Sequence, residues 1–405
     1  MSGTSNMPLN VKIEGIAAGG AGIARVGGKR IFIEESIPSE TVLCRITDEH
    51  RSWVQAELLE VIEASPDRMR PVCEFYGSCG GCTLQHMSYP AQIAAKTAIL
   101  RNAFTRIGDF SLPEPKFSPS EPWEYRNRMQ FHAIRRFDKN HPDAFCGLKA
   151  RKSADIIPVS DCPIADPGIR SLLSGKGADA KGVFVSPGKD RITVYAREGL
   201  LLSEGGVIRG KTRILERELA LDARVFFQSN GAMLEKLVMD LRRIAANFTG
   251  LEAGSLVAEM PMADLYCGVG TLAAFLGEIF PRADMVEENK AALALARENL
   301  ASLGSANFYA KRIEDWTKTA NLHDYGFVVA DPPRQGLDPI LTRRLSKNGP
   351  RVFAYVSCNP ATLARDSKTL LEAYDLTELR WYDFYPQTSH IESLALFIRR
   401  GGRQQ

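Results

Sequence analysis

The sequence lacks the features of a membrane or exported protein. No apolar run reaches the roughly 18 residues that a membrane-spanning helix needs. The opening residues, MSGTSNMPLN, contain neither a basic nor an apolar segment, so we expect no signal peptide. There is no internal repeat and no low-complexity tract. The net charge is only +3, with 51 basic and 48 acidic residues, so any basic surface for a nucleic acid must be local.

The composition is that of an ordinary globular protein. The 405 residues, 44% of them hydrophobic, suffice for two or three domains. Eight cysteines in a chain without an export signal point to a reducing compartment. Clustered cysteines there serve metals or catalysis more often than disulfides. We therefore expect a cytoplasmic, multidomain protein.

Residues 1–65 have the pattern of a small β domain. Glycine-rich turns separate short alternating runs, which is typical of a small barrel of the OB type that binds oligonucleotides. These runs are Val11–Ile13, Arg30–Ile33, Thr41–Ile46 and Gln55–Ile62. The region carries more acids than bases, so its residues leave open both RNA binding and a β module without a binding role.

A basic segment lies between Tyr125 and Lys152. Its cations are interleaved with aromatic rings, a combination that suits single-stranded nucleic acid, although a solvated basic hairpin has the same pattern. The cations are Arg126, Arg128, Arg135, Arg136, Lys139, Lys149, Arg151 and Lys152, and the rings include Tyr125, Phe131, His132, Phe137 and Phe145.

Strands and helices alternate from about residue 220 onward. This alternation predicts a parallel, doubly wound sheet. The expected strands are Met262–Leu265, Ala283–Val286, Gly326–Ala330 and Arg351–Val356.

The first of these strands leads into a glycine-rich loop, Asp264–Gly270. The loop lacks a GxGxxG pattern, which argues against a dinucleotide. Glu287 ends the next strand, where a carboxylate can accept hydrogen bonds from ribose hydroxyls, and Asp331-Pro332-Pro333 follows a later strand. An acidic loop suits a cofactor that carries a sulfonium and an ammonium. Together these features resemble a class I S-adenosylmethionine methyltransferase.

The reaction is indicated by Cys358 and Glu392. Enzymes that methylate exocyclic amines usually have an aromatic residue after the second proline, where this chain has Arg334. A thiolate at Cys358 would instead suit carbon 5 of uracil, because addition at carbon 6 activates carbon 5 as an enolate. Glu392 is then the candidate base that removes the carbon 5 proton. Alone, Cys358 is typical of a small buried hydrophobe and Glu392 of a surface carboxylate; the combination favours catalysis.

Five motifs occur in the order found in bacterial RNA (uracil-5-)-methyltransferases, and the chain resembles the ribosomal branch of that family over nearly its whole length. The motifs are Phe226–Asn230, Asp264–Gly270, Asp331–Gln335, Ser357–Pro360 and Thr388–Glu392. The resemblance implies that Cys358 is the nucleophile and Glu392 the general base. It also implies a TRAM domain in residues 1–65, and Tyr125–Arg128 matches a family segment near the substrate. The implied cofactor contacts are Gln228, Tyr266, Thr271, Glu287 and Asp331.

A cysteine cluster completes the pattern. Four thiolates are available, from Cys73, Cys79, Cys82 and, further downstream, Cys162. Their spacing is compatible with either a tetrahedral zinc ion or a [4Fe–4S] cluster. The family resemblance implies the [4Fe–4S] cluster, with Cys162 as the fourth ligand. We expect it to be structural, because methyl transfer through a cysteine needs no electrons.

The expected fold is an α/β, Rossmann-like methyltransferase domain preceded by two others. Residues 1–65 would be a TRAM-like β-barrel, residues 66–220 an α+β iron–sulfur domain with the basic segment, and residues 221–405 the methyltransferase domain. The expected activity is transfer of a methyl group from S-adenosylmethionine to carbon 5 of a uridine in RNA, with 23S rRNA favoured and a monomer sufficient. The alternatives are a transfer RNA substrate, a different methylated atom, and a non-catalytic iron–sulfur RNA-binding protein.

Overall fold

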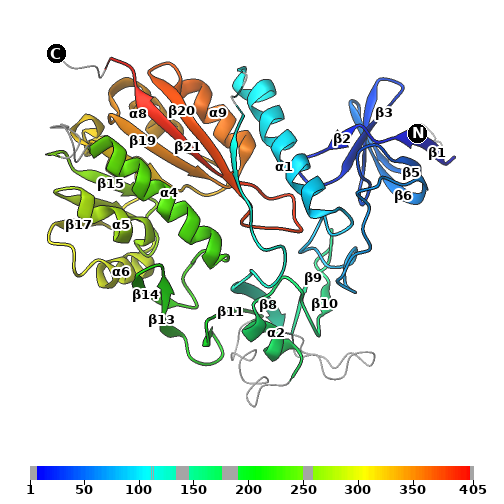
Figure 1. Cartoon of the computed structure of the whole chain (residues 1–405), viewed down its shortest axis with the longest axis horizontal. Coiled ribbons are helices and arrows are strands. Elements are labelled where there is room, and N and C mark those ends of the chain that lie inside the picture. Colours follow the sequence, from blue (N-terminus) through cyan, green and yellow to red (C-terminus); the bar gives the residue numbers. More distant parts are fainter. Residues whose placement is uncertain are drawn as a thin grey trace. The chain divides into compact units, whose positions relative to one another are not determined.

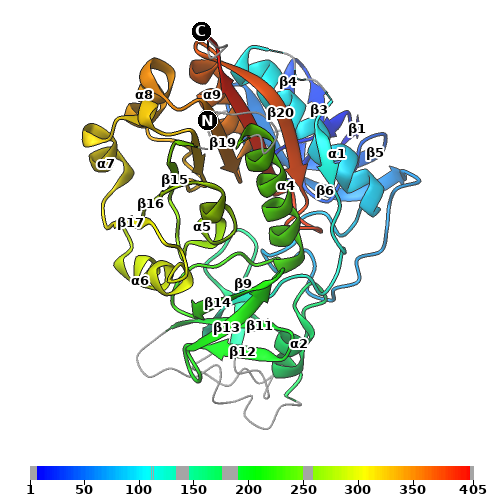
Figure 2. The ribbon, with the colours of Figure 1, turned by 60° about the vertical axis from the view of Figure 1, so that its left-hand side comes forward.

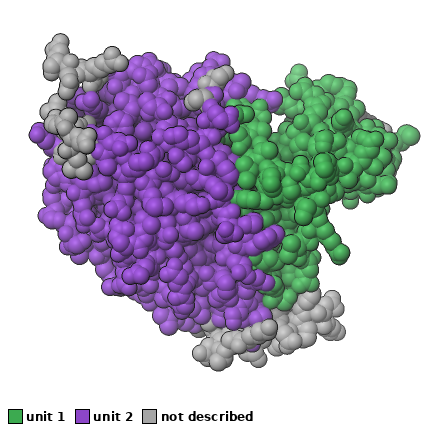
Figure 3. Space-filling view, in the orientation of Figure 1, with its two compact units in different colours: residues 1–102, 132–163, 385–390 green, residues 103–131, 164–384, 391–405 purple. Residues whose placement is uncertain are grey.

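The computed structural model describes residues 7–110, 112, 114–133, 146–175, 190–249 and 259–401. They form two compact units that alternate along the sequence, coloured separately in Figure 3. Unit 1 consists of residues 1–102, 132–163 and 385–390, and unit 2 of residues 103–131, 164–384 and 391–405. The predicted domain boundaries at residues 65 and 220 stay predictions. Across the described residues, no helix is long and apolar enough to cross a membrane.

Unit 1 begins with a six-stranded sheet, the blue part of Figure 1. The strand order is β1-β5-β6-β4-β3-β2, and every pair is antiparallel except β4 with β6. Alternate residues such as Val42 and Cys44 are buried in one apolar core, as the two-residue period of a half-buried sheet requires. The strands are β1 (Leu9–Lys12), β2 (Gly15–Ile16), β3 (Gly22–Val26), β4 (Lys29–Ile33), β5 (Thr41–Glu49) and β6 (Trp53–Glu63). The four predicted strands are confirmed within a few residues, and closure into a barrel stays a prediction.

The rest of unit 1 is a helix and a short sheet. Helix α1 (Tyr89–Ala103) follows the cysteine-rich segment. The side-chain amide of Gln92 in this helix donates a hydrogen bond to the side-chain oxygen of Gln387 (3.0 Å). The hairpin of β9 (Cys146–Lys149) and β10 (Ile156–Pro158) pairs with the end of β8 (Arg128–Ala133). Residues 134–145 lie outside the described residues, and with them Arg135, Arg136, Phe137, Lys139 and Phe145 of the basic segment.

Unit 2 is built on an eight-stranded sheet of order β17-β16-β15-β18-β19-β21-β20-β7. Five strands are parallel, as predicted, and four of them occupy the predicted ranges to within one residue. The prediction of a parallel sheet is correct for these five strands and wrong for β21, which runs antiparallel between β19 and β20. A strand that returns directly from its neighbour needs no crossover helix, so β21 enters antiparallel after β20. The strands are β7 (Lys116–Ser118), β15 (Met262–Leu265), β16 (Ala283–Val286), β17 (Ala306–Tyr309), β18 (Phe327–Ala330), β19 (Val352–Ser357), β20 (Tyr374–Tyr382) and β21 (Glu392–Arg399).

The order of these strands reverses beside β15. The chain moves outward from β15 to β17 and then returns to place β18 on the other side of β15. Because such crossovers are right-handed, the two directions put helices on opposite faces of the sheet. Accordingly α4, α5 and α6 pack together, as do α7, α8 and α9 (Figures 1 and 2). A ligand crevice is expected beyond the carboxyl ends of β15 and β18.

The helices of unit 2 are mostly capped by a side chain at their start. Asp338, Asn289 and Asn359 each accept from backbone amides of the first turn. The helices are α2 (Pro167–Leu173), α4 (Gly231–Thr249), α5 (Thr271–Leu276), α6 (Lys290–Asn299), α7 (Ile313–Thr319), α8 (Pro339–Asn348) and α9 (Pro360–Leu370). Shorter turns are η1 (Phe104–Gly108), η3 (Gly277–Ile279) and η4 (Leu322–Asp324). Two hairpins complete the unit: β11 (Arg191–Arg197) with β12 (Leu200–Ser203), and β13 (Arg209–Ile214) with β14 (Arg217–Asp222).

Candidate active site

The loop after β15 has the backbone conformation that a close ligand requires. Tyr266, Gly268 and Gly270 all have positive φ (62°, 55° and 78°), a region that costs a tyrosine about 1–2 kcal/mol. Glu287, at the end of β16, accepts a hydrogen bond from the Gly268 amide at 3.1 Å. Thr271 begins α5 directly after this loop. The structure therefore brings Tyr266, Thr271 and Glu287 to one edge of the sheet.

Asp264 is a buried carboxyl group at the base of this loop. Its Oδ2 accepts from the Ala273 amide at 3.1 Å, whereas Oδ1 is buried with no hydrogen-bond partner. Burial, reinforced by Asp331 and Glu287, raises the pKa of Asp264 to about 8. An adjacent cation would relieve this cost, because opposite charge favours the ionised form.

Gln228 and Asp331 meet at the carboxyl end of β18. The Gln228 side-chain amide donates to the Asp331 carboxylate at 3.3 Å. Asp331 follows the last residue of β18, and its own amide donates to the carbonyl of Leu265 in β15 (3.3 Å). Burial raises the pKa of Asp331, and the bond from Gln228 opposes that rise.

Strand register places Glu392 beside Cys358. Ser357, the last residue of β19, pairs with Ser393 in the antiparallel strand β21. Cys358, which follows Ser357, therefore lies opposite Glu392, which precedes Ser393. Glu392 is 3% exposed and its Oε1 has no hydrogen-bond partner. Burial and the charge of Asp331 raise its pKa well above the ordinary value. Burial also raises the pKa of the half-buried Cys358 thiol to about 12, and Glu392 and Asp331 add to that rise.

Arg334 is a charged residue of the candidate site to which the sequence assigned no role. Its charge lowers the pKa of both Cys358 and Glu392. In the sequence, Arg334 was noted only because it occupies the position after the second proline, where enzymes that methylate exocyclic amines usually have an aromatic residue. Its signal was its place in the loop after Asp331, but no spacing rule shows that this loop and the loop of Cys358 converge.

The arrangement suits a cationic cofactor and a nucleophilic reaction. Three acidic side chains, Asp264, Glu287 and Asp331, lie at this edge of the sheet, and Oδ1 of the buried Asp264 has no hydrogen-bond partner. These residues fit a bound sulfonium and ammonium. Cys358 and Glu392 stand beside one another as a potential nucleophile and proton acceptor.

The predicted metal ligands are not gathered into a site. Among the described residues, no group of three or more His, Cys, Asp or Glu side chains is arranged to hold a metal ion. All four cysteines belong to unit 1, and burial raises the pKa of Cys73, with a smaller contribution from the charge of Cys79. The Gly80 amide donates to the Lys149 carbonyl (2.9 Å), so the backbone of β9 supports this loop. The [4Fe–4S] cluster stays a prediction.

Two cations of the basic segment have different surroundings. Arg151 is half-buried, contacts the acids Glu34 and Glu35, and donates to the Cys82 carbonyl at 2.8 Å, so it serves the structure of unit 1. Arg128 instead lies over the ring of Phe226, 5.5 Å from its centroid, and that ring is 61% exposed. A cation and an exposed ring side by side are suited to nucleic acid.

The fold and the site define a class I methyltransferase, and comparison with known proteins makes the assignment narrower. The sequence model of the family tRNA (Uracil-5-)-methyltransferase matches residues 207–400. An uncharacterized RNA methyltransferase of Treponema denticola is 30% identical over 96% of this chain and 98% of its own length. The 23S rRNA (uracil(1939)-C(5))-methyltransferase RlmD of Shewanella amazonensis is 31% identical over 96% of this chain and 95% of its own.

A solved structure has the same fold. The tRNA (uracil-54, C5)-methyltransferase of Pyrococcus abyssi, in complex with S-adenosyl-L-homocysteine, covers 96% of this chain and 100% of its own length, with a TM-score of 0.71 and 22% identity. The chain belongs to the RNA (uracil-5-)-methyltransferase family, as its motifs predicted. It is an S-adenosylmethionine-dependent RNA methyltransferase.

Proposed function

We propose that this enzyme methylates carbon 5 of a uridine in 23S rRNA through a covalent bond between Cys358 and the base. The observation that carries the proposal is the convergence of Cys358, Glu392 and Asp331 at the ends of β19, β21 and β18. The rRNA target is supported by the relatives named as 23S rRNA methyltransferases. A transfer RNA substrate is the second candidate, because the family description and the solved relative name tRNA.

The proposed reaction begins with addition of Cys358 to uracil and ends with release of the methylated base. Cys358 loses its thiol proton to solvent, and the thiolate sulfur bonds to carbon 6 of uracil while the electrons of the carbon 5–carbon 6 double bond move toward oxygen 4 as an enolate. Carbon 5 then takes the methyl group that S-adenosylmethionine supplies. Glu392 accepts the proton from carbon 5, the bond between sulfur and carbon 6 breaks, and the double bond re-forms. The base must leave its stack to reach Cys358.

The remaining residues are proposed to bind and orient. We assign Gln228, Tyr266, Thr271, Glu287 and Asp331 to the cofactor and reacting base. Arg334 would favour the thiolate and the ionised Glu392, since its charge lowers the pKa of both groups. Residues 1–65, as a TRAM-like module, and Arg128 with Phe226 are proposed to contact RNA, with the enzyme acting as a monomer.

The nucleophile is tested with Cys358→Ala. We expect turnover to be abolished and the dissociation constant for S-adenosylmethionine to stay within about threefold of that of the unaltered protein, because the proposed cofactor residues belong to other segments of the chain. Cys44→Ala, which removes a buried thiol from the sheet of unit 1, is the matched control. Methyl transfer that persists in Cys358→Ala would point to a different methylated atom, such as an exocyclic amine.

We also propose that Cys73, Cys79, Cys82 and Cys162 hold a structural [4Fe–4S] cluster. The support is the shared unit of the four cysteines and the backbone bonds that hold the Cys79 loop to β9. Protein purified without oxygen should contain iron and acid-labile sulfide in equal amounts. Stoichiometric zinc without sulfide, or neither element, would contradict this ligand assignment.

A further inference from the structure

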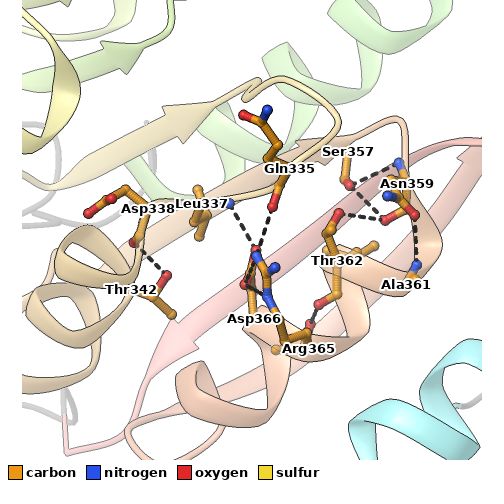
Figure 4. Close-up of polar contacts among 12 residues, drawn as sticks. Gln335, Leu337, Asp338, Thr342, Ser357, Asn359, Ala361, Thr362, Arg365 and Asp366 are labelled. Carbon is orange, nitrogen blue, oxygen red and sulfur yellow. Dashed lines mark hydrogen bonds and ion pairs between the residues drawn. The ribbon is translucent and has the colours of Figure 1, made fainter.

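The loop that carries Arg334 is fastened to helix α9 at three points. Asn359 Nδ2 donates to the Arg334 carbonyl (3.0 Å), and a guanidinium nitrogen of Arg365 donates to the Gln335 carbonyl (2.9 Å). The amide of Leu337 donates to Asp366 Oδ2 (2.9 Å). Figure 4 shows the bonds that join Gln335 and Leu337 to Arg365 and Asp366. We refer to Asn359, Arg365 and Asp366 as the α9 clamp.

Asp366 is the centre of this clamp. The residue is 4% exposed, and its carboxylate also accepts from the Tyr355 hydroxyl in β19 (2.9 Å) and pairs with Arg365 (2.7 Å). Gly336, whose φ is +80°, lies so close that an added Cβ would stand 2.6 Å from Asp366 Oδ2. A buried carboxylate with this many donors fixes its neighbours firmly, because the loss of any bond would leave polar groups unpaired.

The clamp connects two parts of the candidate site. Helix α9 begins at Pro360, immediately after Cys358 and Asn359, so its first turns are covalently tied to the nucleophile. The loop that it holds begins at Asp331 and contains Arg334. One helix therefore determines where the cation of the loop stands relative to the thiol.

We propose that Asp366 is a positioning residue for methyl transfer, which holds the Arg334 loop against α9 and so keeps the guanidinium charge near Cys358 and Glu392. The inference rests on the proposed function, because it assumes that Cys358 reacts as a thiolate. Asp366 itself is expected to touch neither base nor cofactor.

The charges that act on Cys358 make the expected effect specific. Glu392 in β21 and Asp331 after β18 raise the pKa of the thiol, and Arg334 lowers it. If the loop moved away from α9, the charge of Arg334 would oppose the two acids less, and the pKa of the Cys358 thiol would rise. The thiolate fraction at a given pH would fall, by about threefold for half a pKa unit.

The test compares Asp366→Asn with the unaltered protein. The rate at which iodoacetamide alkylates Cys358 is measured from pH 7 to 10 by mass spectrometry of its peptide. We expect alkylation at least about threefold slower and kcat lower by about tenfold or more, with the affinity for S-adenosylmethionine retained. Arg365→Gln, at a side chain that is 52% exposed, keeps the test available if Asp366→Asn does not fold.

A double-mutant cycle separates positioning from general loss of stability. If Asp366 acts through Arg334, Asp366→Asn should slow alkylation much less in an Arg334→Ala background. Asp315→Asn, which breaks an exposed ion pair with Lys318, is the matched control and should change nothing. Additive effects, or an unaltered alkylation profile in Asp366→Asn, would overturn the inference. If the unaltered protein makes no 5-methyluridine in RNA, the proposed function has failed instead.

Discussion

Replacing Glu392 by glutamine should separate the two halves of the proposed reaction. Glu392 is buried, and burial together with the charge of Asp331 raises its pKa well above the ordinary value, whereas the charge of Arg334 favours the ionised form that accepts a proton. Glutamine has nearly the same shape as glutamate but carries no carboxylate that could accept a proton. We therefore expect the fold and the environment of Cys358 to be preserved, with only the capacity to accept a proton lost.

The size of the effect follows from the role of a general base. Removing one slows proton transfer by about 10²- to 10⁴-fold, equal to roughly 3 to 5 kcal/mol in the barrier. Addition of Cys358 and transfer of the methyl group come before that step. Glu392→Gln should therefore take up about one methyl group per molecule and then stop, with protein and methylated RNA covalently joined.

The assay follows a labelled methyl group on a denaturing gel. With the unaltered enzyme the label should leave with free RNA, and with Glu392→Gln it should remain at the position of the protein–RNA complex. Glu378→Gln, at a carboxylate in β20 paired with surface cations, is the matched control and should turn over normally. Turnover by Glu392→Gln within a few-fold of the unaltered enzyme would refute the assignment of the base.

Two further predictions concern the cofactor loop and the clamp. The pKa of Asp264 is raised to about 8 and that of Asp331 is also raised, so both carboxyls in the folded protein hold protons that the unfolded chain would lose. The free energy of unfolding without cofactor should therefore fall as pH rises from about 4 towards 8. Binding of S-adenosylmethionine should release protons and tighten over the upper part of that range, as titration calorimetry in buffers of different ionisation enthalpy can show; binding independent of pH would contradict this account. Gly336→Ala should lower the free energy of unfolding by more than about 1 kcal/mol in denaturant titrations, because its positive φ and the nearby Asp366 leave no room for a Cβ, whereas Gly304→Ala, in open space, should not.

The sequence predicted those parts of the fold that depend on local pattern. The strands β15 and β16 were predicted with the bounds that the structure has, and β18 and β19 within one residue, because short apolar runs bounded by turn residues identify buried parallel strands. β2 and β3 were missed, since glycine-rich pairs of short strands have little alternation to detect. The antiparallel place of β21 depends on strand pairing after β20, which no local pattern encodes.

The candidate site shows the same division. Motif order identified Gln228, Asp331, Cys358 and Glu392 as candidates. The structure places Asp331, Cys358 and Glu392 at the ends of neighbouring strands, and Gln228 is hydrogen-bonded to Asp331. Arg334 and Asp366 could not be valued from the sequence. Their importance arises from the packing of a loop against α9, which is a tertiary contact between residues that are otherwise ordinary members of a loop and a helix.

The most direct test of the account is methyl transfer from labelled S-adenosylmethionine to unmodified 23S rRNA and, separately, to unmodified transfer RNA, with nucleoside analysis of each product. The account predicts 5-methyluridine at one site in 23S rRNA and none in transfer RNA. If 5-methyluridine appeared in transfer RNA alone, the proposed reaction would stand and the proposed 23S rRNA substrate would be wrong. Methylation at any atom other than carbon 5 of uridine would contradict the central claim.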